Sequence, residues 1–177
     1  MPIHHTSSAQ LRALQTRGCL LPMIILIDYH SGQLADAIAA KDHLALVSIR
    51  NHGAASNVRT GWKHLLELEF DDDARVDWAG SGMAAAQADL IVDFCSWLGS
   101  STEPIGLILR CDHGRRRSAA VSKALGEWCD LWVENPGLRY SRPAYQTMRR
   151  RIGTLTPPAT AKFGGAGWQR VAMRVAH

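Results

Sequence analysis

The sequence predicts an α/β fold: a single domain with a central, mostly parallel sheet flanked by helices. Short apolar runs typical of buried strands alternate along the chain with segments of helical periodicity, and this order favours a parallel sheet covered by helices. The length of 177 residues suits one domain that buries a full core. With 46% hydrophobic and 20% charged residues, the composition is that of a globular protein and excludes a disordered or fibrous chain.

The first half of the chain contains three strand-like runs and one short helix. Residues 24–27 are continuously apolar and directly follow Met23, so residues 1–22 are predicted to be an extension. Residues 34–40 have a helical pattern. The remaining two runs are residues 44–49, a buried strand, and residues 65–70, which alternate apolar and acidic as a half-exposed strand does.

The second half begins with a predicted helix over about residues 83–98. Its apolar residues are spaced by four and three, which predicts that one helical face is buried: Leu90, Phe94 and Trp97, flanked by Ile91, Cys95 and Leu98. Residues 105–109 form a nearly continuous apolar run, typical of a strand covered on both faces. A polar loop and another helix follow, with a predicted core face consisting of Val121, Leu125, Trp128 and Trp132. A last basic helix is predicted at residues 143–152, so the domain spans residues 23–153 and a basic tail spans 154–177.

Charge is distributed unevenly. From Asn135 onward there are eight basic residues and no acidic one, whereas the rest of the chain carries 12 basic and 16 acidic residues. A basic tail of this kind is typical of contact with nucleic acid or an acidic partner, or of a solvated tail. No apolar run is long enough to cross a bilayer. The four cysteines form no C-x-x-C pair, so we expect no disulfide framework. Together with the short apolar runs, this predicts a cytoplasmic protein without membrane contact.

The loop after the strand at residues 105–109 carries the residues of chemical interest. A strand–loop–helix junction gathers unpaired N–H groups at the positive end of a helix dipole, where an anion binds. Cys111 at the start of this loop would have its thiol pKa lowered toward the nucleophilic thiolate. Arg117 would grip phosphoryl oxygens with its guanidinium. Gly114 would let the loop turn, and Ser118 would offer its hydroxyl to the sulfur.

The pattern Cys111-x-x-Gly114-x-x-Arg117-Ser118 resembles the phosphate loop of the protein tyrosine phosphatase superfamily, closest to its small dual-specificity members. The resemblance extends in element order over about residues 23–152. It implies hydrolysis of a phosphomonoester, with a phosphorylated protein as substrate, through a phosphocysteine and without metal or cofactor. Substrate contacts are then expected from the loop itself, from Asp112, His113, Gly114, Arg115 and Arg116.

The same resemblance implies a general acid on a loop after an upstream strand. Leu68-x-Phe70-x-Asp72 matches that pattern, so Asp72 is expected to protonate the leaving oxygen. Asp71 and Asp73 are close rivals, and Asp77 is a weaker one. One position departs from the family: Arg110 precedes the cysteine where histidine is usual, although a cation there would still favour a thiolate.

Other readings of the loop remain open at this stage. The first is a binding module that holds phosphate without turnover, which Arg110 favours. The second is an RNA 5′-phosphatase, favoured by the basic tail. Sulfur-transfer and arsenate-reducing enzymes also use cysteine loops, but Gly114 and Arg117-Ser118 fit the phosphatase pattern better. His113 has no second metal ligand at suitable spacing, and Cys19, Cys95 and Cys129 are interpreted as structural.

Overall fold

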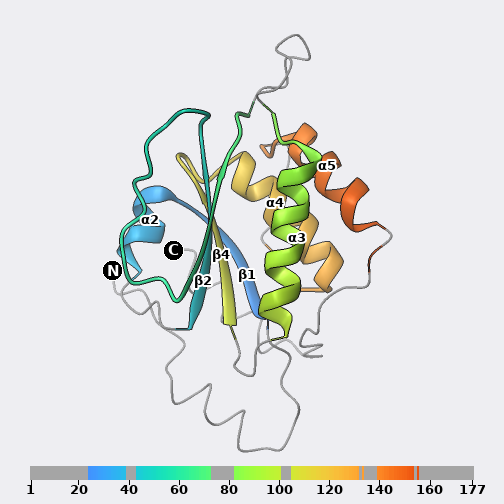
Figure 1. The fold of residues 1–177 in the computed structure, drawn as a ribbon, viewed down its shortest axis with the longest axis horizontal. Helices are drawn as coiled ribbons and strands as arrows, with labels where there is room; N and C mark the ends of the chain where they lie inside the picture. The colour runs from blue at the N-terminus through green and yellow to red at the C-terminus, as the bar shows by residue number, and fades with distance from the viewer. Residues whose placement is uncertain are drawn as a thin grey trace, which may run out of the picture.

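The computed structural model describes residues 24–38, 43–72, 82–100, 105–131, 133, 139–153 and 155. They form one α/β domain, as predicted (Figure 1). A single sheet contains four strands, all parallel, in the order β1-β4-β2-β3. The strands are β1 (Ile24–Ser31), β2 (Leu44–Arg50), β3 (His64–Glu69) and β4 (Ile105–Cys111), and the helices are α2 (Gly32–Ala37), α3 (Ala85–Gly99), α4 (Arg117–Cys129) and α5 (Arg142–Ile152).

Each strand predicted from the sequence is present, and its position in the sheet explains its pattern. Every residue of β4 is buried, because β4 lies between β1 and β2 and has helices on both faces. By contrast, β3 is an edge strand and only Leu68 among its residues is buried. Parallel neighbours require crossover connections. Helices α2 and α3 lie in two of these connections, whereas residues 51–63 join β2 to its parallel neighbour β3 without a helix.

Helices cover the two faces of the sheet unequally. In Figure 1, α3, α4 and α5 lie on one side of the sheet and the short α2 lies on the other. The main core lies between the sheet and the three helices, where Leu107 and Leu109 of β4 meet Val121 and Leu125 of α4. Trp128 is also buried in this core, as expected for a structural role, while Trp132 lies outside the described residues.

The buried face of α3 is centred on the flanking row of the predicted apolar face and not on Leu90, Phe94 and Trp97. Leu90 and Trp97 are 50% and 53% exposed, and the buried residues of the helix belong to the adjacent row, Ala88, Ile91, Val92, Cys95 and Leu98. Both rows are apolar, so periodicity alone could not choose between them. The row that faces the core includes small residues, which let the helix approach the sheet closely. Trp97 instead stacks edge-on against His64 of β3, with ring centroids 4.7 Å apart.

Two helix boundaries differ slightly from the prediction. The helix expected at residues 34–40 spans Gly32–Ala37, because Ser31 caps its first turn by accepting a hydrogen bond from the Leu34 N–H at 3.3 Å. The last helix begins at Arg142, one residue before the predicted start, with Pro143 in its first turn. Among the described residues, no helix combines the length and apolar character needed to cross a bilayer.

Candidate active site

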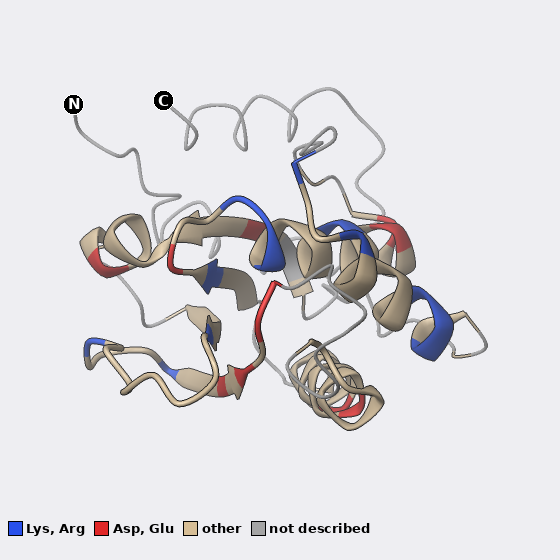
Figure 2. Cartoon of the chain, turned by 90° about the horizontal axis from the view of Figure 1, so that it is seen from above, with Lys and Arg blue, Asp and Glu red and all other residues tan. Residues whose placement is uncertain are grey.

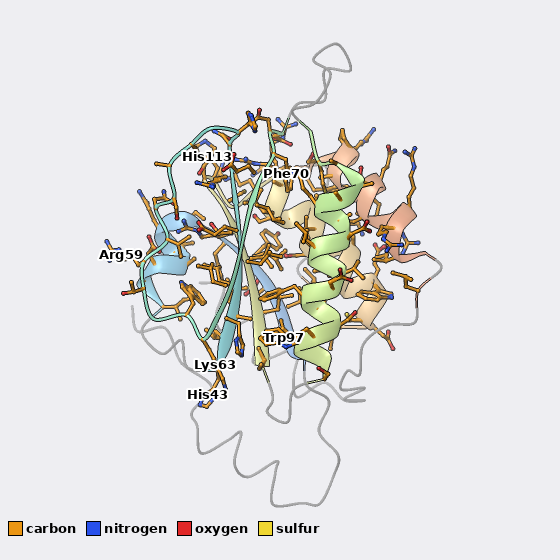
Figure 3. The ribbon with its side chains drawn as sticks, viewed as in Figure 1. His43, Arg59, Lys63, Phe70, Trp97 and His113 are labelled. Atoms are coloured by element: carbon orange, nitrogen blue, oxygen red, sulfur yellow. The ribbon has the colours of Figure 1, made fainter. Side chains whose placement is uncertain are left out.

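The candidate site lies at the carboxyl edge of the sheet, where ligands bind in open parallel sheets. The loop that follows Cys111 at the end of β4 meets the chain that leaves β3 at Phe70. Figure 3 shows the labelled His113 and Phe70 at this end of the sheet and His43 and Lys63 at the other. Because β1 and β4 are adjacent, the loop also contacts the end of β1, where Ser31 is the register partner of Cys111.

Gly114 allows the loop to turn tightly against β1. Its φ of 62° lies in the left-handed region, which residues with a Cβ avoid. A Cβ at this position would lie 2.2 Å from the Ser31 nitrogen and 2.4 Å from the His30 carbonyl carbon. The turn is closed by a hydrogen bond of 3.2 Å from the Gly114 N–H to the Cys111 carbonyl oxygen. Glycine is therefore required here for both conformation and space.

The Cys111 sulfur lies in a ring of hydrogen-bond donors. Its Sγ is 3.2 Å from the Ser118 Oγ, and the backbone N–H groups of Arg116 and Ser118 also donate to it. Burial opposes ionisation of the thiol. The hydrogen bonds from Ser118 and Arg116, together with the charge of Arg117, outweigh burial and lower the pKa of the Cys111 thiol. The junction therefore provides the electrostatic environment that the sequence predicted.

The two other described cysteines lie in the opposite environment. Burial raises the pKa of the Cys129 thiol to about 12. Burial, followed by the proximity of Cys129, also raises the pKa of the Cys95 thiol well above its ordinary value. Both are enclosed by the apolar core, which agrees with a structural interpretation of these residues.

Arg117 is the first residue of α4 and its side chain faces inward. It is 5% exposed. One terminal nitrogen donates to the Phe70 carbonyl oxygen at 2.7 Å and the other to the Asp112 carboxylate at 2.9 Å. The guanidinium thus joins the end of β3 to the loop, beside the Cys111 sulfur. An oxyanion that bound Arg117 through both terminal nitrogens would have to displace these two acceptors.

The structure distinguishes between the adjacent aspartates. An ion pair of 2.5 Å between the Arg116 Nε and Asp72 Oδ2 holds the Asp72 carboxylate beside the loop. Its other oxygen, Oδ1, is buried and has no hydrogen-bond partner among the described residues. Asp71 instead accepts a hydrogen bond of 3.1 Å from the His52 N–H, in the turn after β2. Asp73 and Asp77 lie outside the described residues.

The remaining loop residues form an exposed rim. Asp112, His113, Arg115 and Arg116 are exposed, whereas Gly114 is partly buried. No cluster of three or more His, Cys, Asp or Glu residues in the described ranges has the geometry of a metal site. The basic tail at residues 154–177, on which the RNA reading depends, lies outside the described residues except for Leu155.

Arg110 has a role that the sequence reasoning did not find. Alternate residues of a strand point to opposite faces, so its side chain leaves the sheet on the face away from Cys111. It is 3% exposed. The guanidinium donates to the Ser48 Oγ at 3.0 Å, to Asp36 at 3.2 Å and to the Asn57 side chain. Arg110 was expected to favour the thiolate, but its guanidinium instead forms part of a buried polar network on the other face of the sheet. The alternation of side chains along a strand could have indicated this.

No protein-family model, curated protein or solved structure gives a significant match to this chain. The interpretation of the site therefore depends on the residues and their geometry.

Proposed function

We propose that this chain is a cysteine-dependent phosphomonoester hydrolase of the tyrosine or dual-specificity kind, acting on phosphorylated protein. The observation that carries the proposal is the environment of the Cys111 sulfur. Its pKa is lowered by hydrogen bonds from Ser118 and Arg116 and by the charge of Arg117 despite burial. The same donors lie at the N-terminus of α4, where a helix dipole favours a phosphoryl dianion.

The residues present supply each part of a two-step displacement. In the first step the Cys111 thiolate attacks phosphorus, a sulfur–phosphorus bond forms and the bond to the leaving oxygen breaks, while protonated Asp72 donates its proton to that oxygen. In the second step water attacks phosphorus, the Asp72 carboxylate takes a proton and the sulfur–phosphorus bond breaks. Ser118, 3.2 Å from the sulfur, stabilises the departing thiolate, and inorganic phosphate is released.

Asp72 is the acid that fits this scheme, because the ion pair with Arg116 holds its carboxylate beside the loop. The Oδ2 atom is engaged by Arg116, and the buried Oδ1 atom has no partner among the described residues. Arg117 would supply the charge stabilisation of the transition state, with the phosphoryl oxygens taking the places of the Phe70 carbonyl and the Asp112 carboxylate.

Hydrolysis of a small aryl phosphate tests this proposal. We expect steady turnover of 4-nitrophenyl phosphate by the wild type, and loss of at least about a hundredfold in Cys111→Ser, because a hydroxyl is a far weaker nucleophile than a thiolate. Cys95→Ser is the matched control, since Cys95 lies outside the site; circular dichroism checks that it folds. Equal activity of the Cys111→Ser variant and the wild type would show that the sulfur is not the nucleophile.

A second candidate is a binding module that holds phosphate without turnover. The Arg117–Asp112 ion pair favours it, because an internal carboxylate occupies the guanidinium that would act in catalysis. Calorimetric binding of inorganic phosphate together with no release of nitrophenol would support this candidate over the enzyme. Release of nitrophenol that depends on Cys111 would exclude it.

A further inference from the structure

Three exposed arginines surround one side of the candidate site. They are Arg115 in the loop, Arg139 in the segment before α5 and Arg142 at the first position of α5, and together they are called the basic rim here. The N-terminus of α5 adjoins the loop, because the Ser141 N–H donates to the Arg116 carbonyl oxygen at 3.0 Å. Arg142 follows Ser141 directly and Arg139 precedes it by two positions, so this contact brings the chain that carries both arginines to the loop.

The charges of the basic rim have no counter-ion among the described residues. Within the described ranges, none of its three arginines forms an ion pair or a hydrogen bond through its side chain. Farther along α5, Arg149 pairs with Glu127 at 3.3 Å and Arg151 pairs with Asp89, whereas Arg150 is exposed. The unpaired arginines of the basic rim place positive charge beside the loop, where it attracts an anionic ligand.

The opposite side of the site has the opposite charge. Asp71 and Asp72 follow β3 there, and Figure 2 shows the blue ribbon of the loop next to the red end of this strand. A negatively charged group on a substrate finds carboxylates on that side, with Asp72 already paired with Arg116, and is attracted to the basic rim instead. A peptide bound through its phosphate therefore meets basic residues on one side of the phosphorylated residue and acidic residues on the other.

We propose that the substrate is a phosphopeptide with one or two acidic residues on one side of the phosphorylated residue, which contact the basic rim. This inference rests on the proposed function. The basic rim is short, because two of the three arginines at the end of α5, Arg149 and Arg151, are paired with acidic residues. It therefore fits one or two carboxylates, whereas a run of nucleic-acid phosphates needs a longer track of free cations.

Matched phosphotyrosine peptides test the inference, because their aryl leaving group resembles that of 4-nitrophenyl phosphate. One peptide carries two Glu before the phosphotyrosine, a second carries two Glu after it, and a third carries Gln at all four positions. We expect one Glu peptide to have a kcat/KM about fivefold above that of the Gln peptide at low salt, as two surface ion pairs would give. The preference should shrink as salt screens the charges.

Variants locate the effect on the basic rim. Arg139→Gln combined with Arg142→Gln should abolish the preference and leave hydrolysis of 4-nitrophenyl phosphate within about twofold, because that compound has no group to reach the rim. The control is Arg150→Gln, an exposed arginine of the same helix two turns farther on, which should retain the preference.

The outcomes separate this inference from the proposed function. If nitrophenol release continues, any of three results would overturn the inference. They are equal rates on the three peptides, a preference that survives in the double variant, and faster hydrolysis of an RNA 5′ phosphate than of any peptide. Absence of nitrophenol release by the wild type would overturn the proposed function itself, and the inference with it.

Discussion

At the scale of single residues, the cysteines show how neighbours decide the chemistry of a thiol. Cys95, Cys111 and Cys129 are all buried, and burial alone raises a thiol pKa. Only at Cys111 do donors and a guanidinium surround the sulfur and reverse that effect. At Cys129 nothing opposes burial, and the pKa is raised to about 12.

This difference predicts selective alkylation. In a Cys19→Ser background, iodoacetamide at neutral pH should modify Cys111 and leave Cys95 and Cys129 unmodified, as measured by mass spectrometry of the digested protein. The rate at Cys111 should rise as the pH increases through its lowered pKa and level off below the pH at which an ordinary thiol ionises.

Ser118→Ala provides the control for that titration, because it removes the hydroxyl 3.2 Å from the sulfur. Its rate profile should move to higher pH than that of the parent protein. A parent rate that keeps rising in parallel with a free thiol would contradict the lowered pKa.

At the scale of elements, the turn between β4 and α4 depends on one glycine. A Cβ at Gly114 would overlap the backbone of β1 at His30 and Ser31, and backbone atoms at the end of a sheet cannot move aside cheaply. Gly114→Ala should therefore displace the loop, lower the activity on 4-nitrophenyl phosphate by at least about a hundredfold and destabilise the fold by more than about 1 kcal/mol. Kinetic assays and urea unfolding measure the two effects.

Gly53 is a matched control for this variant. Its φ of 73° is also left-handed, but nothing lies within 4 Å of where a Cβ would stand. Gly53→Ala should therefore show only the backbone strain, about 1 kcal/mol, with activity retained. Similar losses of activity in both variants would mean that the close approach to β1 is not what shapes the loop.

At the scale of the whole molecule, Arg110 connects parts of the fold that are distant in sequence. Its guanidinium joins β4 to Ser48 of β2, Asp36 of α2 and Asn57 in the segment that leads to β3. Arg110→Met should cost about 3 kcal/mol of unfolding free energy, because it leaves buried polar partners unsatisfied. Urea unfolding provides the measurement.

Arg59 allows a comparison at the same carboxylate. It approaches Asp36 at 3.8 Å, but its side chain is 75% exposed, so Arg59→Met should cost less than about 1 kcal/mol. Figure 3 shows the labelled Arg59 at the outer side of α2. Equal costs for the two variants would argue against a buried network centred on Arg110.

What the sequence determined by itself was local. Apolar patterns and turn residues a few positions apart predict the strands and helices of the described chain and the strand–loop–helix junction. They also place Cys111, Gly114 and Arg117 in the loop of that junction. Hydrogen bonding between Ser118 and the sulfur, expected from the loop pattern, is present as well. These features depend on neighbours in the chain, which the sequence displays directly.

Only the tertiary structure decided which residues meet across the fold. It placed Asp72 rather than Asp71 at the loop, through a contact with Arg116, and it turned Arg110 away from the sulfur into a network with β2 and α2. It also chose the buried row of α3 between two apolar candidates. Each of these outcomes depends on packing between segments that are distant in sequence. The pattern of apolar and polar residues along the chain does not show which of two similar helix faces is buried, or which of two adjacent carboxylates contacts the loop.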